Sequence, residues 1–231
     1  DQKPSFRIEM DHYVDSAELL GLDDLTLNNM RSDPTMMHER FAYKVARESG
    51  IAAPRASYAF IRVNDQAYGL YAHIEHVERR FLERWYDDPN GSLYEAGDVD
   101  FTTELIPNYE HESGPDDRSA LYALADVLTL PTQPEQVAAA TMVDMEQFIT
   151  HWGSMAIVGQ FDAFPYTYDD YYVYVNPADG RINFLPWGMD EAFSRTDYWL
   201  LAGESLWPDA CQHDTDCLTT VIDDIWRALD T

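Results

Sequence analysis

Four of the aspartates in the last third of the chain could together hold a cation. Asp162 follows a long apolar segment, and Asp169 and Asp170 end the aromatic loop FDAFPYTYDD. Asp190 follows the apolar run INFLPWGM. Carboxylates gathered in one place repel one another unless a cation or bound protons neutralise them, and oxygen ligands open to solvent suit magnesium bound to a nucleotide. The alternative is that each acid caps a turn or faces water, as most aspartates do.

A predicted hairpin would place Asp170 beside Asp190. The run YYVYV is typical of a strand, PADG of a turn, and RINFLPW of the antiparallel partner strand. Because a tight turn aligns the two strands, their outer ends lie together, and these ends carry Asp170 and Asp190. The segment MEQFITHWGSMAIVGQF follows Asp144 and is apolar enough for a central, buried helix that ends just before Asp162.

The first part of the chain predicts a strand, a helix and a hairpin. Residues 5–10 alternate with Phe6, Ile8 and Met10 on one face, the period of a half-buried strand. SYAFIRV and YGLYAHIEHV, joined by Asn64-Asp65, predict two hairpin strands.

The helix between them is predicted over residues 33–50. Asp33 would cap it, Pro34 would take its first position, and Gly50 would lie just past its end. Phe41, Val45 and Ala46 would form its apolar stripe.

The later part predicts mostly helix. Short helices are expected over 77–85, 118–129, 134–140 and 219–229, with a turn at DDPNGS. Residues 97–118 are acidic without a clear period, and we expect an irregular loop there. The fold class is therefore α+β, with a small strand-rich part (1–76) and a larger, mainly helical part (77–231) in one domain. The cleft between two such lobes is the default binding site.

The charge of the chain narrows its partners. The 231 residues include 15 Lys and Arg against 42 Asp and Glu, a net charge of -27. Such a surface repels nucleic acid and anionic lipid, so neither is expected as a partner. It favours a soluble monomer that works outside the cell or binds divalent cations, although a solvating role explains most of the acids.

The two cysteines, Cys211 and Cys217, lack the spacing of a zinc or redox site. A local disulfide fits better and predicts an extracellular, cell-surface or periplasmic location; two free thiols are the alternative. No apolar run reaches membrane-spanning length, so no membrane insertion is expected. Asp1 is not a natural start, which predicts an excised domain whose targeting segment is missing.

Several ordered blocks resemble one family. GIAAPRASYA, YGLYAHIEHV and LPWGMD, with QFDAFPYTYDDYYVYVNPADGRINF before the last, are similar to the spore coat protein H (CotH) kinase-like family over most of the chain. The resemblance implies an atypical protein-kinase-like fold with two lobes. It also implies ATP with magnesium or manganese as cofactor, and phosphoryl transfer to protein hydroxyls. Calcium is the alternative cation.

The resemblance also assigns roles to single residues. Asp162 resembles the catalytic-loop aspartate that orients or deprotonates the acceptor hydroxyl, and Asp170 and Asp190 match metal ligands. Glu39 resembles the helix glutamate that pairs with a phosphate-binding cation, for which Arg7 and Arg40 are the candidates, with Lys3 just upstream of Arg7. The alternative for Glu39 is a helix-surface acid.

Glu75 matches the hinge between the lobes, where the backbone contacts adenine. The partners expected are thus a nucleotide and a protein substrate or surface partner.

Three departures from the family pattern bear on activity. Gly188 replaces the first aspartate of the Pro-Trp-Asp-x-Asp block, the residue that resembles the main metal ligand of protein kinases. Asp170 stands where an asparagine is usual, and Glu95 where a lysine is common. An active secreted kinase is one hypothesis. A degenerate kinase fold that acts as an extracellular binding or surface-structural module is the second, and a calcium-dependent adhesion domain is the third.

Overall fold

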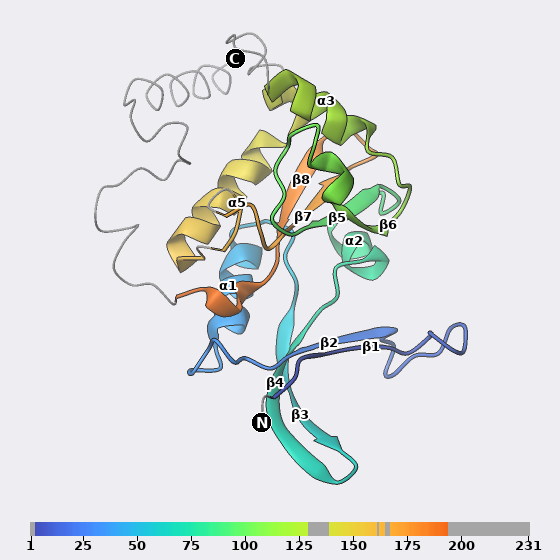
Figure 1. Ribbon diagram of the computed structural model, residues 1–231, viewed down its shortest axis with the longest axis vertical. Coiled ribbons are helices and arrows are strands. Elements are labelled where there is room, and N and C mark those ends of the chain that lie inside the picture. Colours follow the sequence, from blue (N-terminus) through green and yellow to red (C-terminus); the bar gives the residue numbers. More distant parts are fainter. Residues whose placement is uncertain (1–2, 129–138, 161, 165–166, 194–231) are drawn as a thin grey trace.

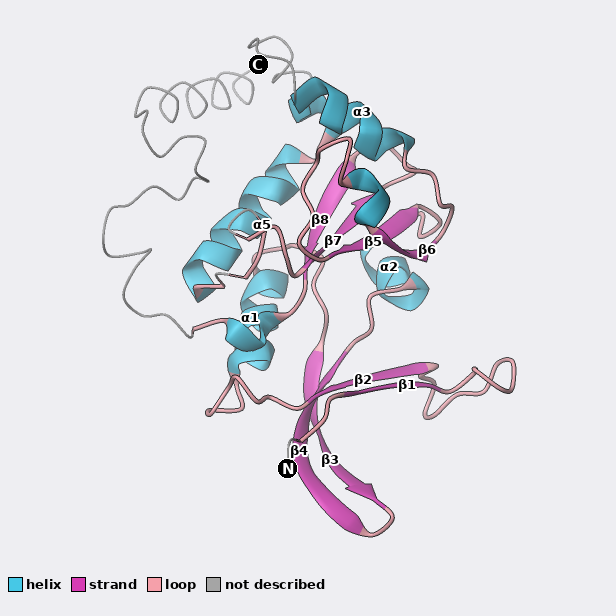
Figure 2. Cartoon of the chain, in the orientation of Figure 1, coloured by secondary structure: helices cyan, strands magenta, loops and turns pink. Residues whose placement is uncertain are grey.

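The structure, a computed structural model, describes residues 3–128, 139–160, 162–164 and 167–193 (Figure 1). Its first sheet has the strand order β1-β2-β4-β3, and all neighbours are antiparallel. The strands are β1 (Phe6–Glu9), β2 (Asp24–Asn28), β3 (Ala56–Val63) and β4 (Gln66–Ile74). The β3–β4 hairpin extends away from the helices (Figure 2). Its turn residues Asn64 and Asp65 both have positive φ, as a two-residue hairpin turn requires.

The second sheet has the order β6-β5-β7-β8, again antiparallel. It contains β5 (Ser92–Ala96), β6 (Glu110–Ser113), β7 (Tyr171–Val175) and β8 (Ile182–Pro186). Successive β7 residues are buried on opposite faces: Tyr171 and Val173 join one apolar cluster, and Tyr172 and Tyr174 join another. Because both faces are covered, the β7–β8 hairpin is the most buried part of this sheet.

Helices cover these two faces. Helix α3 (Ser119–Leu128) and α5 (Met145–Val158) pack over one face, and α2 (Arg79–Trp85) packs on the other. Helix α1 (His38–Glu48) lies against α5 and the short 3₁₀ helix η2 (Met189–Glu191). A second 3₁₀ helix, η1, spans Ile106–Asn108. The ends of α5 are set locally: the Asp144 side chain accepts a hydrogen bond from the Gln147 amide (3.1 Å), and Gly159 takes the left-handed conformation.

The α+β class is confirmed, and so are both predicted hairpins and helices at 79–85, 119–128 and 145–158. The start of α1 and the place of Phe41 in its apolar stripe were predicted wrongly, whereas Ala46 is buried and Val45 packs against the core as predicted. The helix begins at His38, because residues 33–37 form a turn in which Asp33 accepts from the His38 amide (2.6 Å). Phe41 is 46% exposed; the residues that α1 buries are His38, Glu39, Ala42, Tyr43 and Ala46. Ile8 on β1 is likewise 39% exposed.

The irregular loop predicted over 97–118 is also corrected, because β6 and η1 lie within it. The strands β2, in the first sheet, and β5, in the second, were not predicted either. With β5 and β6 added to the predicted hairpin, the later part holds a four-stranded sheet beside its helices. Most of the helix predicted over 134–140, the helix predicted over 219–229, and the Cys211–Cys217 disulfide lie outside the described residues. No helix within the described ranges is long and apolar enough to cross a membrane.

Candidate functional site

Asp170 and the loop after β8 meet at the end of the β7–β8 hairpin. Gly188 has φ +53°, and a Cβ built on it would overlap the carboxyl group of Asp170. The Asp170 carboxylate therefore occupies the space in which a side chain at residue 188 would begin. The Trp187 amide donates to the Asp170 carbonyl oxygen (3.2 Å), which extends the hairpin pairing to this point. The hairpin thus brings Asp170 to Gly188, two residues before Asp190, which the sequence predicted to lie beside Asp170.

The other three aspartates act on Asp170 through their charges. Asp162, Asp169 and Asp190 all raise the pKa of Asp170 through their charges, so the four carboxyl groups are close enough to repel one another. Asp162 accepts a hydrogen bond from Thr167 Oγ1 (3.0 Å), and Asp169 accepts from the Asp170 amide (2.9 Å). We call Asp162, Asp169, Asp170 and Asp190 the aspartate cluster.

Burial and like charge together disfavour the ionised form of Asp170 and of Asp190. Burial is the main cause that raises the pKa of Asp170 to about 9, and the neighbouring acids add to it. The pKa of Asp190 is raised as well, mainly by burial and partly by Asp162. A bound divalent cation would reverse this balance, because it favours the ionised form of every ligand.

Glu39 on α1 adds a fifth acid to this region. It is 4% exposed, Asn28 Nδ2 donates to its Oε1 (3.2 Å), and its Oε2 has no hydrogen-bond partner among the described residues. Burial, followed by the charge of Asp190, raises its pKa to about 8. The buried Tyr43 hydroxyl, one turn along the same helix face, is influenced by the charges of Glu39, Asp170 and Asp190. Glu39 is therefore not a helix-surface acid.

Two side chains fix the loop that carries Gly188 and Asp190. Gln160 is fully buried, and its Nε2 donates to the Gly188 carbonyl oxygen (2.8 Å). His38 Nδ1 donates to the Asp190 carbonyl oxygen (3.0 Å), and its Nε2 lies 3.3 Å from Asp33 Oδ1. Gln160, which follows α5, and His38, at the start of α1, thus both fix the position of η2.

These positioning residues were not identified from the sequence. Tyr43 carries the one local signal, because it follows Glu39 by four residues on a predicted helix and must share its face. Gln160 and His38 carry none: their partners are 28 and 152 residues away along the chain.

The two candidate arginines have other partners. Arg7 Nη2 donates to His76 Nε2 (2.9 Å), and the guanidinium lies 3.9 Å from Asp24 and 4.0 Å from Glu112. Arg40 is exposed and lies over the ring of Tyr58. Neither forms an ion pair with Glu39 within the described part of the chain.

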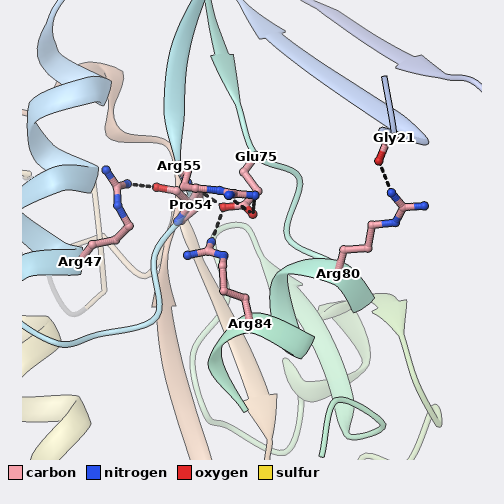
Figure 3. Close-up of polar contacts among 7 residues, drawn as sticks. All are labelled: Gly21, Arg47, Pro54, Arg55, Glu75, Arg80 and Arg84. Atoms are coloured by element: carbon pink, nitrogen blue, oxygen red, sulfur yellow. Dashed lines mark hydrogen bonds and ion pairs between the residues drawn. The ribbon is translucent and has the colours of Figure 1, made fainter. Parts of the chain in front are cut away.

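Glu75 forms a separate cluster at the start of the link between β4 and α2 (Figure 3). Its carboxylate accepts from the Arg55 amide (2.8 Å), from Arg55 Nη2 (2.9 Å) and from Arg84. The Glu75 amide itself donates to the Arg55 carbonyl oxygen (2.8 Å). Through these bonds Glu75 joins the β4–α2 link both to the segment before β3, which carries Arg55, and to α2, which carries Arg84.

Glu95 also lies away from solvent. On β5 it accepts from the Tyr172 hydroxyl (2.9 Å), and burial raises its pKa. Glu110 on β6 and Asp169 in the aspartate cluster raise the pKa of Glu95 further through their charges. Glu95 therefore lies between acidic side chains of the cluster and of β6.

The donor types of the aspartate cluster suit a divalent cation, although no three of its carboxylates bring ligand atoms within 4.8 Å of one another among the described residues. Asp170 and Asp190 offer oxygen ligands of partly buried side chains, and Asp162 lies beside them with its carboxylate bonded only to Thr167 within the described residues. Hard cations such as magnesium and manganese prefer such ligands, and their charge would offset the repulsion within the cluster. A cation held by two of these carboxylates would lie near a third one that could accept a proton.

Comparison with known proteins gives one family over nearly the whole chain. The family model described as CotH kinase protein matches residues 1–226. Inner spore coat protein H of Bacillus subtilis (strain 168) is 23% identical over 190 residues, which are 76% of this chain and 51% of that protein. An inner spore coat protein H-like protein of the same strain is 36% identical over 74 residues, 32% of this chain and 22% of that protein. The chain spans about half the length of the first of these relatives and less of the second.

Proposed function

Because the chain belongs to the CotH kinase protein family, we propose that it is a protein kinase of the secreted or surface class. It would use ATP with magnesium or manganese, transfer a phosphoryl group to protein hydroxyls, and bind the nucleotide between two kinase-like lobes. Both relatives are named for the inner spore coat. Those names support a surface location for this chain.

One observation carries the proposal: the Asp170 carboxylate lies in the space of the missing side chain at residue 188. In the family pattern an aspartate at 188 would supply the main metal ligand. Here Asp170 brings a carboxylate to the same place from the neighbouring strand. On this proposal Gly188 does not abolish the metal site, because the Asp170 carboxylate would take the place of the missing one.

The residues of the cluster divide the chemistry between them. Asp170 and Asp190 would hold the cation, whose role is to neutralise charge on the phosphates. Asp162 would orient the acceptor hydroxyl and accept its proton, a contribution of typically about 100- to 10,000-fold in rate. The hydroxyl oxygen forms a bond to the γ-phosphorus, the bond from that phosphorus to the bridging oxygen breaks, and ADP leaves.

The first sheet and α1 would supply the nucleotide contacts. Arg7 lies on β1, the strand that would carry the phosphate-binding cation, and its side chain is 50% exposed. Arg7 could therefore exchange its present partners for phosphate oxygens. Glu39 would orient that arginine, Arg40 would serve as the alternative cation, and the backbone at Glu75 would face adenine. Each of these contacts requires a rearrangement, since Arg7 and the Glu75 amide already have partners.

A second candidate is a binding or surface-structural module without catalysis. It is favoured by the charges around the cluster, since no lysine or arginine among the described residues forms an ion pair with Glu39, Asp162, Asp170 or Asp190. Glu95 adds another acid where a nucleotide would require a positive charge.

Thermal unfolding with ATP and manganese, combined with transfer of radiolabelled γ-phosphate, separates the two functions. For a kinase we expect ATP with manganese to raise the Tm and label to enter the protein. Asp162→Ala should then lose about 100-fold or more of the label while keeping the Tm shift. Thr167→Ala is the matched control, because it removes only the hydrogen bond to Asp162.

Three other outcomes contradict parts of this proposal. No Tm shift and no incorporated label would exclude the active kinase and favour the binding or surface-structural module. Label that survives Asp162→Ala would overturn the role of Asp162. A shift with calcium alone would favour an adhesion domain.

A further inference from the structure

A second group of potential metal ligands lies where the start of β2 meets the link between β4 and α2. Asp24 is the first residue of β2, and His76 and Glu78 belong to the link. Each offers one ligand atom, and the three atoms lie within 4.8 Å of one another. We propose that Asp24, His76 and Glu78 bind a divalent transition-metal cation, Zn²⁺ or Mn²⁺, at a site distinct from the aspartate cluster.

The donor set points to this class of cation. One imidazole with two carboxylates is a mixed nitrogen and oxygen set, which suits zinc and manganese better than magnesium or calcium. Two carboxylates also match the charge of one divalent ion. The aspartate cluster, by contrast, offers oxygen alone.

Buried polar atoms without partners give an independent reason. Asp24 Oδ1 and His76 Nδ1 are both inaccessible to solvent and have no hydrogen-bond partner among the described residues. The Asp24 side chain is 11% exposed. A buried polar atom normally has a partner, because leaving it unpaired costs about 1–3 kcal/mol. A cation bound among these side chains would supply the missing interaction.

The charges nearby also favour a cation. Burial, then the charges of Asp23 and Asp24, raises the pKa of Glu78 to about 7. Burial is likewise the largest cause of the raised pKa of Asp24, which Glu9, Asp23 and Asp11 raise further. Metal binding would relieve this repulsion in the same way as protonation does, but with a higher charge.

Arg7 is the group with which the metal must compete. It donates to His76 Nε2 (2.9 Å) and lies 3.9 Å from Asp24, so it partly neutralises the empty site. It also lies 4.0 Å from Glu112 on β6 and can keep that partner when the other two bind metal. Arg7→Gln should therefore strengthen metal binding.

A metal here would join β2 to the link that connects the first sheet with α2. The site does not depend on kinase activity, and none of its three ligands belongs to the aspartate cluster. Its loss and the loss of phosphoryl transfer are therefore separate events.

Manganese binding detected by pulsed electron paramagnetic resonance tests the site. Mn²⁺ alone, added to the metal-stripped chain, should show coupling to an imidazole ¹⁴N nucleus, which carboxylate ligands cannot give. His76→Asn should remove that coupling and weaken Mn²⁺ and Zn²⁺ binding at least about 10-fold. His73→Asn, a nearby histidine on β4 outside the ligand set, should leave it unchanged.

Two further variants keep the result interpretable. Asp24→Asn should weaken Mn²⁺ binding even where His76→Asn unfolds the protein, and Asp170→Asn should leave the ¹⁴N coupling intact. Absence of the coupling in the wild-type protein, or its survival in folded His76→Asn, would overturn the proposal. So would equal loss in His73→Asn.

Discussion

The Asp170 carboxylate lies where a side chain at Gly188 would begin, so the two positions compete for one space. Both residues have positive φ, +52° at Asp170 and +53° at Gly188. Aspartate tolerates this left-handed conformation better than most residues, and glycine adopts it freely. The hairpin therefore accepts one carboxylate at this point, and in this chain it comes from residue 170.

Exchanging the two residues tests this competition. Gly188→Asp alone should destabilise the protein by about 1–3 kcal/mol, because its Cβ would overlap the Asp170 carboxyl group. Combining it with Asp170→Gly should recover most of that loss, since glycine empties the shared space. Urea unfolding of the wild type, both single variants and the double variant gives the coupling free energy.

The same four proteins also report on metal binding. Asp170→Gly alone should reduce the manganese-dependent rise in Tm to the part that the separate Asp24–His76–Glu78 site supplies, and the double variant should regain part of the loss. Additive destabilisation by the two substitutions would mean that the residues do not compete.

Asp170→Asn should separate charge from shape. Asparagine keeps the size of the side chain and needs no proton, whereas Asp170, whose folded pKa is about 9, must take up a proton on folding at pH about 8. The metal-free protein should therefore gain at least about 1 kcal/mol at that pH. The rise in Tm with manganese should shrink at the same time, because a ligand charge is lost. Calorimetry with and without manganese measures both effects. Asp179→Asn on the exposed β7–β8 turn is the control, and a metal-free Tm that falls instead would contradict repulsion at Asp170.

The stability of the metal-free protein should fall as pH rises from about 5 to about 9. Glu39 has a folded-state pKa of about 8 against an ordinary value of 4.5. A group with a raised folded pKa contributes stability that is present below its unfolded pKa and is lost as pH passes its folded pKa. Glutamine at residue 39 cannot titrate. Between pH about 5 and about 9, the unfolding free energy of Glu39→Gln should therefore change by at least about 1 kcal/mol less than that of the wild type.

Glu48→Gln is the control for this measurement. Glu48 lies on the same helix, is exposed and pairs with Lys44, so its replacement should leave the pH dependence as in the wild type. Asp170 retains its own raised pKa in Glu39→Gln, so a smaller slope is expected rather than none. An unchanged slope would show that Glu39 is ionised in the folded state throughout.

Glu75→Ala should destabilise the protein by about 1–3 kcal/mol. The substitution leaves Arg55 and Arg84 without their shared carboxylate, and Arg47 adds a third cation nearby (Figure 3). Glu83→Ala, which breaks an exposed pair with Arg79, should cost less than about 0.5 kcal/mol. Chemical denaturation compares the two, and equal costs would mean that the Glu75 cluster contributes no more than a surface pair.

Features with local causes were predictable from the sequence. Alternating apolar residues and Asn64-Asp65 determine the β3–β4 hairpin, and Asp144 and Gly159 determine the ends of α5, because each feature depends on residues within one or two turns of chain. The β7–β8 hairpin follows in the same way and brings Asp170 to the loop of Asp190. The acidic, mixed α+β character and the family resemblance also come from the sequence alone.

Contacts between distant segments were decided only by the tertiary structure. The strand β2 is only five residues long, and its short alternation of Leu25 and Leu27 with polar residues was not recognised as a strand. Neither the Asp24–His76–Glu78 group nor the contact of Asn28 with Glu39 was therefore predicted. Glu39 is buried because α1 packs on α5 and η2, which no helical period specifies. The overlap of Asp170 with Gly188 depends on two backbone conformations and their separation in space. A sequence shows which residues are present, but the packing of the elements decides which of them share one space.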